Sequence, residues 1–171
     1  MATVIENMSN ADYHAHSAIS KSGLDLIEKS PAHFFYAERE KTKEMVIGSA
    51  FHDLVLLPET FNELYIIKPA EMNFSTKAGK EWKQQAEESG KEILTEEEFN
   101  QINAMKESVL AHHAAGRLLS NGKPETSIFW QDEIGVECRC RPDFINVNNV
   151  IVDLKTTTDA SPKGFAKSVA N

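Results

Sequence analysis

Two acids and a lysine near the end of the chain have the types and spacing of a metal-dependent hydrolytic site. Asp143 begins one β-branched run, and Asp153 and Lys155 lie in a second run rich in valine and isoleucine. A buried carboxylate is costly unless it is paired or holds a metal ion. Two carboxylates held close together repel each other unless a divalent cation lies between them, and such oxygen ligands suit Mg²⁺. The stretch therefore predicts a magnesium site in a β-hairpin.

The length of the hairpin loop decides whether the two acids meet. Asn148 and Asn149 separate the two runs and tolerate the positive φ of a tight turn. A two-residue loop would place Asp143 and Asp153 on opposite faces, whereas a three-residue loop or a bulge would set them opposite each other with Cβ atoms about 5 Å apart. We predict the longer loop. Lys155 shares a strand face with Asp153 and would then lie beside a metal-bound water or the scissile phosphate.

A histidine in an apolar helix is a candidate third ligand. The stretch from Glu44 to Leu57 is apolar over most of a helical circumference, so we expect a largely buried helix. His52 lies about one turn after Gly48, whose missing side chain leaves a gap through which an imidazole could reach a metal. A lone histidine in such a helix is more often a core residue, but the two hairpin acids favour the ligand role. Asp53 is rotated by about 100° and is expected to be a surface or capping residue.

These residues together resemble a known family. Pro142-Asp143 followed by Asp153-Leu154-Lys155 is similar to the PD-(D/E)-x-K nuclease signature. The stretch from Gly48 to His52 is similar to the G-x-x-x-H helix of the RecB-like branch, and the run from Ser20 to Tyr36 resembles the start of the exonuclease VIII (RecE) nuclease domain. The likeness extends over residues 13–167, nearly the whole chain.

The resemblance implies a fold, a site and a reaction. The fold is α/β of restriction-endonuclease type, with a central mixed sheet that contains an antiparallel meander and is flanked by helices. The reaction is Mg²⁺-dependent digestion of linear double-stranded DNA from its ends, 5′ to 3′, in phage-type or recombination DNA processing, with Mn²⁺ able to substitute. The implied partners are a ring-shaped homo-oligomer and a RecT-like single-strand annealing protein. The implied metal ligands are His52, Asp143, Asp153 and the Leu154 carbonyl, with Lys155 as the catalytic lysine and Glu125 as a supporting or second-metal group.

One part of the family pattern is missing. Ser161-Pro162 predicts the N-cap and first position of a helix, but the chain stops soon afterwards. The Gln-x-x-x-Tyr motif that binds DNA on this helix in the family is therefore absent, and we expect a single nuclease domain over residues 1–171 with a truncated C-terminal part. One alternative is an impaired DNA-binding or assembly module. Another is a structure-specific or Cas4-like endonuclease, which is less favoured because Cys138 and Cys140 cannot supply four iron–sulfur ligands.

The composition is that of one soluble globular domain. The 171 residues are 41% hydrophobic and 26% charged, with a formal net charge of −8. This charge argues against a protein that coats nucleic acid through bulk electrostatics, although a nuclease needs only a local basic strip. No apolar run is long enough to span a membrane and no signal pattern begins the chain, so we expect a cytoplasmic protein. Candidate DNA contacts are Lys77, Lys80, Lys83, Arg139 and Arg141, of which the lysines are more simply solvated surface groups.

The remaining patterns predict the framework. Residues 1–12 lack periodicity and are expected to be a mobile end. Ser20 or Ser22 should cap a helix, and Pro31 should open another whose aromatic residues 34–36 lie in the core. A short strand is expected at 64–67 and a charged helix at 76–89.

The second half should contain a long helix and then strands. Thr95 and Glu98 form a capping box that starts a helix reaching Ser120, with His112-His113 near its C-terminal end. Strands are predicted at 127–131 and 136–140, the second running on into Pro142-Asp143, to give a three-stranded antiparallel meander. Cys138 and Cys140, two apart on one strand, are expected to be reduced core thiols.

Overall fold

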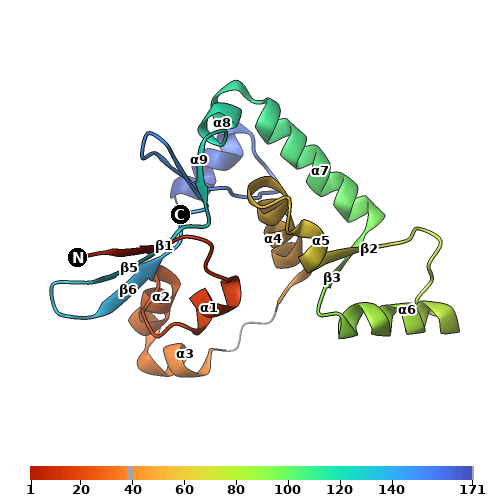
Figure 1. Cartoon of the computed structure of the whole chain (residues 1–171), viewed down its shortest axis with the longest axis horizontal. Coiled ribbons are helices and arrows are strands. Elements are labelled where there is room, and N and C mark those ends of the chain that lie inside the picture. Colours follow the sequence, from red (N-terminus) through yellow and green to blue (C-terminus); the bar gives the residue numbers. More distant parts are fainter. Residues whose placement is uncertain (38–40, 171) are drawn as a thin grey trace.

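The computed structural model describes residues 1–37 and 41–170, and it has an α/β architecture (Figure 1). Within this part of the chain the helices are α1 (Asn10–Ala15), α2 (Lys21–Lys29), α3 (Pro31–Tyr36), α4 (Lys43–Leu56), α5 (Phe61–Leu64), α6 (Lys77–Glu88), α7 (Glu96–Ala111), α8 (His113–Leu118) and α9 (Pro162–Ala170). The strands are β1 (Thr3–Ile5), β2 (Tyr65–Lys68), β3 (Glu92–Thr95), β4 (Gly122–Pro124), β5 (Ser127–Gln131), β6 (Glu137–Cys140), β7 (Phe144–Asn146) and β8 (Ile151–Val152). None of the described helices has the length and apolar character needed to cross a membrane.

The strands form small sheets rather than one continuous sheet. In the described residues the antiparallel orders are β1-β5-β6 and β4-β7-β8, and β2 pairs in parallel with β3. In Figure 1 the sheet β1-β5-β6 lies with α1 to α3 on one side of the molecule, and β2, β3 and α6 lie on the other. Helix α4 lies between them in this view and packs mainly against α7.

Helix α4 is largely buried, as its apolar pattern predicts. Ala50 and Phe51 are 0% and 2% exposed, and they belong to a cluster with Ile102 of α7, Phe144 of β7 and Leu154. Burial of apolar surface is the main favourable term in folding, so this cluster fixes the β7–β8 hairpin against α4. The helix that carries His52 and the strand that follows Asp143 therefore share one core.

The hairpin loop has the predicted longer form. Phe144 pairs with Val152, the Asn146 amide donates to the Val150 carbonyl at 3.0 Å, and the loop comprises residues 147–149. Asn149 takes φ 59°, a left-handed conformation that asparagine tolerates better than most residues. Continuing this register by one pair sets Asp143 opposite Asp153, so the predicted loop length is confirmed.

The predicted three-stranded meander is wrong in its third strand. β5 and β6 form the expected hairpin, but the chain then leaves that sheet, and β7 pairs with β4 on one side and β8 on the other. Pro142 lies at the break and has no N–H to continue a ladder. The Glu125 amide, just after β4, donates instead to the Asp143 carbonyl at 3.0 Å.

The helix starts follow their sequence signals closely. The Ser20 hydroxyl accepts from the Gly23 amide and so caps α2, and Pro31 is the first residue of α3. Thr95 and Glu98 make both hydrogen bonds of a capping box at the start of α7. These signals involve residues within one turn of each other, so no tertiary contact is needed to satisfy them.

Several other expectations need correction. The N-terminal residues, expected to be mobile, contain β1, which pairs with β5, and the start of α1. The helix expected to reach Ser120 breaks at His112, whose side chain accepts from the Ala115 amide and caps α8. Strand β3 was not predicted, because four residues before a capping box carry little periodicity. The two thiols are free, but Cys140 is exposed and is not a core residue.

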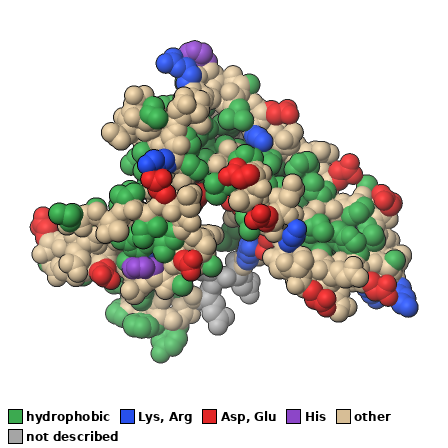
Figure 2. All heavy atoms as spheres, in the orientation of Figure 1, with side chains coloured by type: hydrophobic (Ala, Val, Ile, Leu, Met, Phe, Trp, Pro, Cys, Tyr) green, Lys and Arg blue, Asp and Glu red, His purple; other side chains and the backbone are tan. Residues whose placement is uncertain are grey.

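The aromatic residues of α3 lie mainly on the surface rather than in the core. Phe35 and Tyr36 are 77% and 84% exposed, and Phe34 is 40% exposed. Figure 2 shows the hydrophobic surface that these side chains form over α3. Helix α3 has only six residues and buries none of them, so its composition alone misled the prediction.

Candidate functional site

His52 and Asp143 lie side by side, as the sequence predicts. The His52 Nδ1 atom is 3.6 Å from the Asp143 Oδ2 atom, and the two side chains are 24% and 15% exposed. The same Asp143 oxygen accepts the Leu154 amide at 2.6 Å, which holds the carboxylate across the hairpin. An imidazole and a carboxylate in this position can bind a divalent cation together or form an ion pair when the histidine is protonated.

Gly48 of α4 lies beside the chain that follows Lys155. A Cβ atom built at this position would be 3.4 Å from the Thr156 Oγ1 atom, which is an ordinary van der Waals contact. The glycine that begins the G-x-x-x-H pattern therefore faces the end of the hairpin, one turn before His52.

Asp153 and Lys155 form a separate, exposed pair. Each Asp153 carboxylate oxygen is 2.8 Å from the Lys155 Nζ atom, and the two side chains are 57% and 72% exposed. Across the described residues, no three His, Cys, Asp or Glu side chains are grouped so that they could hold a metal ion. The structure thus brings His52 and Asp143 together, while the Asp153 carboxylate is bound to the lysine instead of completing the set.

Glu125 lies against the backbone of Asp143. It follows β4 with φ 46°, its amide donates to the Asp143 carbonyl, and its carboxylate is 3.8 Å from the Arg141 Nη1 atom. Burial raises the pKa of Glu125 to about 7; the Arg141 cation opposes this shift, and the Asp143 and Asp53 carboxylates add to it. Glu125 is thus bonded to the Asp143 backbone, and its supporting or second-metal role stays a prediction.

Asp53 has a role that its helical position did not reveal. Its Oδ2 atom accepts the Tyr65 hydroxyl at 2.6 Å, and burial raises the pKa of Asp53, with the Tyr65 hydrogen bond acting in the opposite direction. Asp53 is half-buried, and the expectation of a surface or capping residue missed this contact with Tyr65 of β2. Nothing local to α4 indicates that partner, which is twelve residues away.

A cleft of about 750 Å³ lies beside these residues. One wall is the N-terminal segment of residues 7–10, and the facing wall includes Gly48, Ser49 and His52 of α4. Figure 2 shows the molecule hollowed between α1 and α4. Acidic side chains outnumber basic ones along the lining, where the acids are Asp53, Glu59, Glu63, Glu92 and Glu125. A polyanion such as DNA is therefore not favoured inside this cleft.

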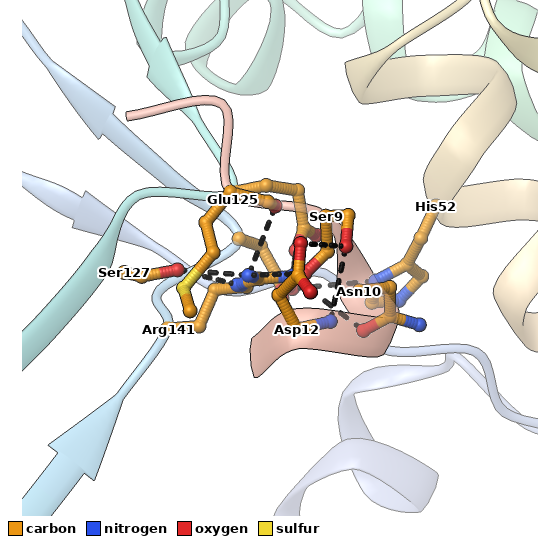
Figure 3. A network of polar contacts seen from close by, with 9 residues as sticks. Ser9, Asn10, Asp12, His52, Glu125, Ser127 and Arg141 are labelled. Atoms are coloured by element: carbon orange, nitrogen blue, oxygen red, sulfur yellow. Dashed lines mark hydrogen bonds and ion pairs between the residues drawn. The ribbon is translucent and has the colours of Figure 1, made fainter. Parts of the chain in front are cut away.

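The two arginines predicted to contact DNA are used inside the protein. Arg139 donates to the backbone oxygens of Tyr13, His14 and His16. The Arg141 side chain is only 7% exposed and contacts Ser127 and the N-terminal segment (Figure 3). Both guanidinium groups are thus held by partners inside the protein, which leaves Arg141 little surface for DNA, and the predicted DNA contacts of the two arginines stay predictions.

The three lysines of α6 lie away from the candidate site. Lys77 and Lys83 pair with Glu81 and Glu87 one turn further on, and α6 is at the edge of the molecule opposite the β1-β5-β6 sheet (Figure 1). Paired surface lysines fit the simpler interpretation of solvated groups. A DNA role for Lys77 and Lys80 stays a prediction.

Three features together define a PD-(D/E)-x-K type of domain: the buried helix with its glycine and histidine, the acid at the start of β7, and the Asp-x-Lys segment of the hairpin. The comparison with protein families agrees. Residues 20–171 match the family described as a PDDEXK-like domain of unknown function (DUF3799), and the chain belongs to that family. The match supports the PD-(D/E)-x-K nuclease superfamily and does not single out exonuclease VIII. Searches of curated proteins and of solved structures each found no match.

Proposed function

We propose that this protein is a Mg²⁺-dependent deoxyribonuclease that hydrolyses phosphodiester bonds of linear double-stranded DNA from its ends. The observation that carries the proposal is the 3.6 Å approach of His52 to Asp143, which directly precedes a hairpin whose Phe144–Val152 pair, continued by one position, would set Asp153 opposite Asp143. Membership of a PDDEXK-like family supports the same chemistry, since nucleases of that superfamily commonly use divalent metals.

The donor atoms suit a divalent cation in their chemistry. His52, Asp143 and Asp153 would hold it, with the Leu154 carbonyl as a fourth group. When bound, the cation would lower the pKa of a coordinated water and neutralise charge on the phosphate. Two of the three side chains already adjoin. Asp153 could join them by turning away from Lys155, so binding of the cation and release of the lysine are coupled in this proposal.

The protein's own groups would then divide the work. The Leu154 amide keeps the Asp143 carboxylate turned across the hairpin at 2.6 Å. Lys155, which is 72% exposed, would be released to face solvent and the incoming phosphate, where it would orient the attacking water and stabilise the developing charge. The acidic cleft on the other side of His52 is unfavourable to DNA, so the backbone would approach over the exposed face of Asp153 and Lys155.

The finer features of the proposal come from the resemblance to the RecB-like branch. Phosphate contacts are blind to sequence, so specificity for a DNA end is expected rather than for a base sequence. We extend the proposal to 5′ to 3′ digestion, a ring-shaped homo-oligomer, a RecT-like annealing partner, Mn²⁺ as an alternative metal and a cytoplasmic location. Light scattering of the purified protein tests the oligomer, and end-labelled duplexes test the polarity.

One structural observation favours a second candidate function. Because the Asp153 carboxylate is bound to Lys155 and no complete ligand group is present among the described residues, the chain would also suit a DNA-binding or assembly module with impaired catalysis. A structure-specific or Cas4-like endonuclease is the remaining alternative with the same chemistry.

The test incubates linear and circular duplex DNA with Mg²⁺ and compares the wild type with Asp153→Asn and Lys155→Ala. Both positions are exposed, so these changes should leave the fold intact. Lys21→Ala, at an exposed lysine of helix α2 that likewise pairs with an aspartate, is the matched control. Digestion of linear DNA alone, lost in both site variants and kept in the control, supports the exonuclease. Cutting of circles favours the endonuclease, and DNA binding without cutting by the wild type favours the module.

A further inference from the structure

Arg141 joins three parts of the chain through a nearly buried guanidinium group. Its Nε and Nη2 atoms donate to the Ser127 hydroxyl at 2.9 and 2.8 Å, and Nη2 also donates to the backbone oxygens of Met8 at 3.1 Å and Ser9 at 3.3 Å (Figure 3). The Nη1 atom lies 3.5 Å from the Asn10 side-chain oxygen. A rigid fork of donors can hold several acceptors at once, which a lysine ammonium cannot do with the same geometry.

The charge of this guanidinium is compensated locally. The Glu125 carboxylate is 3.8 Å away, and the ring centroid of Tyr13 is 4.1 Å from the Arg141 Cζ atom. A cation close to an aromatic ring is stabilised by the ring's negative face. A buried charge is tolerated only when it is paired in this way, so the contacts of Arg141, Glu125 and Tyr13 depend on one another.

These contacts end at Asp143. Arg141 is two residues before it, and Pro142 between them has a fixed φ, so the position of the guanidinium sets the direction in which the chain enters β7. On the other side, the Glu125 amide donates to the Asp143 carbonyl at 3.0 Å. Arg141 is thus connected to Asp143 in two ways: along the backbone through Pro142, and through its contact with Glu125.

The segment that Arg141 holds is also a wall of the cleft. Residues 7–10 line the cleft opposite His52, and they lie outside the residues 20–171 that match the family. The family pattern alone therefore gives no reason to connect this segment with the site. The hydrogen bonds from Arg141 provide that connection.

We propose that Arg141 is a positioning residue, which fixes the Asp143 carboxylate and makes residues 8–13 part of the site architecture. Its consequence for catalysis rests on the proposed nuclease function, but the positioning itself does not. The group that reports on it is the Leu154 amide, because that amide donates directly to the Asp143 carboxylate. If Arg141 is lost, this amide should open to solvent more often while the core stays closed.

The experiment measures amide hydrogen exchange in the wild type, Arg141→Lys and Arg139→Lys. Arg139 is the matched control, because it lies two residues earlier and holds the other end of α1 through the backbone oxygens of Tyr13 and His16. The Ile102 amide, in the fully buried part of α7, serves as the reference for global unfolding. We expect Arg141→Lys to speed exchange at Leu154 by about tenfold relative to Ile102, and Arg139→Lys to leave this ratio within about twofold.

Ser127→Ala provides a gentler second variant should Arg141→Lys fail to fold, since it removes only the hydroxyl acceptor of Arg141. Ser127→Ala should also raise the exchange rate at Leu154 relative to that at Ile102. An unchanged ratio in the folded variants, or an equal change in Arg139→Lys, would overturn the positioning role.

Titration with Mn²⁺ separates this inference from the proposed function. We expect Arg141→Lys to weaken Mn²⁺ binding by about tenfold and Arg139→Lys to leave it nearly unchanged, since groups that support metal ligands commonly contribute 10- to 100-fold in affinity. If the wild type binds no Mn²⁺, the nuclease proposal fails, and the exchange ratio at Leu154 still decides the role of Arg141.

Discussion

Two substitutions at Asp143 separate the structural and chemical roles of its carboxylate. Asp143→Asn keeps an oxygen that can accept the Leu154 amide at the observed 2.6 Å, but it removes the negative charge beside His52. Asp143→Ala removes both the acceptor and the charge. The two variants should differ in the free energy of unfolding, whereas both should lose binding of a cation.

The magnitude follows from the burial of the hydrogen-bonded groups. Asp143 is 15% exposed and Leu154 is 7% exposed, so the Leu154 amide has little access to replacement water. A buried donor left without a partner costs about 1–3 kcal/mol. We expect Asp143→Ala to lose about that much, and Asp143→Asn to lose about 1 kcal/mol or less because its amide oxygen still accepts. For a domain of this size each kcal/mol lowers Tm by about 2–4 °C.

The assay combines urea unfolding, followed by circular dichroism, with Mn²⁺ titration and DNA digestion. Both variants should lose metal binding and digestion to a similar extent, while only Asp143→Ala should be clearly less stable than the wild type. Equal stability of the two variants would refute the hydrogen bond to Leu154 as a stabilising contact. Wild-type metal affinity in Asp143→Asn would refute the ligand role of Asp143.

Three further predictions concern the framework around the site. Glu98→Gln should lower stability by about 0.5–1 kcal/mol at pH 7, because Glu98 lies 2.9 Å from Lys43 at the start of α4. Burial acts to raise the pKa of Glu98, but the Lys43 hydrogen bond and charge hold it below its usual value. The stabilisation is therefore present above the unfolded pKa and is lost as pH falls through the folded pKa. The urea midpoints of wild type and variant should accordingly converge in acid. Tyr65→Phe should cost about 1–3 kcal/mol because it leaves the half-buried Asp53 carboxylate without its 2.6 Å donor. In a double-mutant cycle, a smaller loss in the Asp53→Asn background would identify this contact. Phe35→Ser should change the unfolding free energy by less than about 0.5 kcal/mol, since the side chain is 77% exposed, and a large loss would show that α3 packs more tightly than its exposure indicates.

The features that the sequence predicts correctly depend on residues close together in the chain. Ser20 caps α2 and Thr95 with Glu98 caps α7, because each cap satisfies amides within one turn. The apolar pattern of α4 predicts its burial, since that pattern repeats around the whole helix. The length of the hairpin loop could be predicted because a strand residue faces one of two sides of a sheet, and the longer loop is the one that puts both acids on the same side.

The features that the sequence did not reveal depend on partners far along the chain. The strand break at Pro142 is local, but the choice of β4 as the new neighbour of β7 is not, and neither is the use of Arg141 to hold residues 8–9. The aromatic residues of α3 have the composition of a core segment in the sequence, but in the structure they lie mainly on the surface. The sequence by itself determined the chemical groups of the site, the helix that carries His52 and the register of the hairpin. Only the tertiary structure decided which partners the charged groups take. Arg141 is internal because its contacts with Ser127 and the N-terminal segment exclude water from its charge, whereas Asp153 and Lys155 stay exposed and pair with each other.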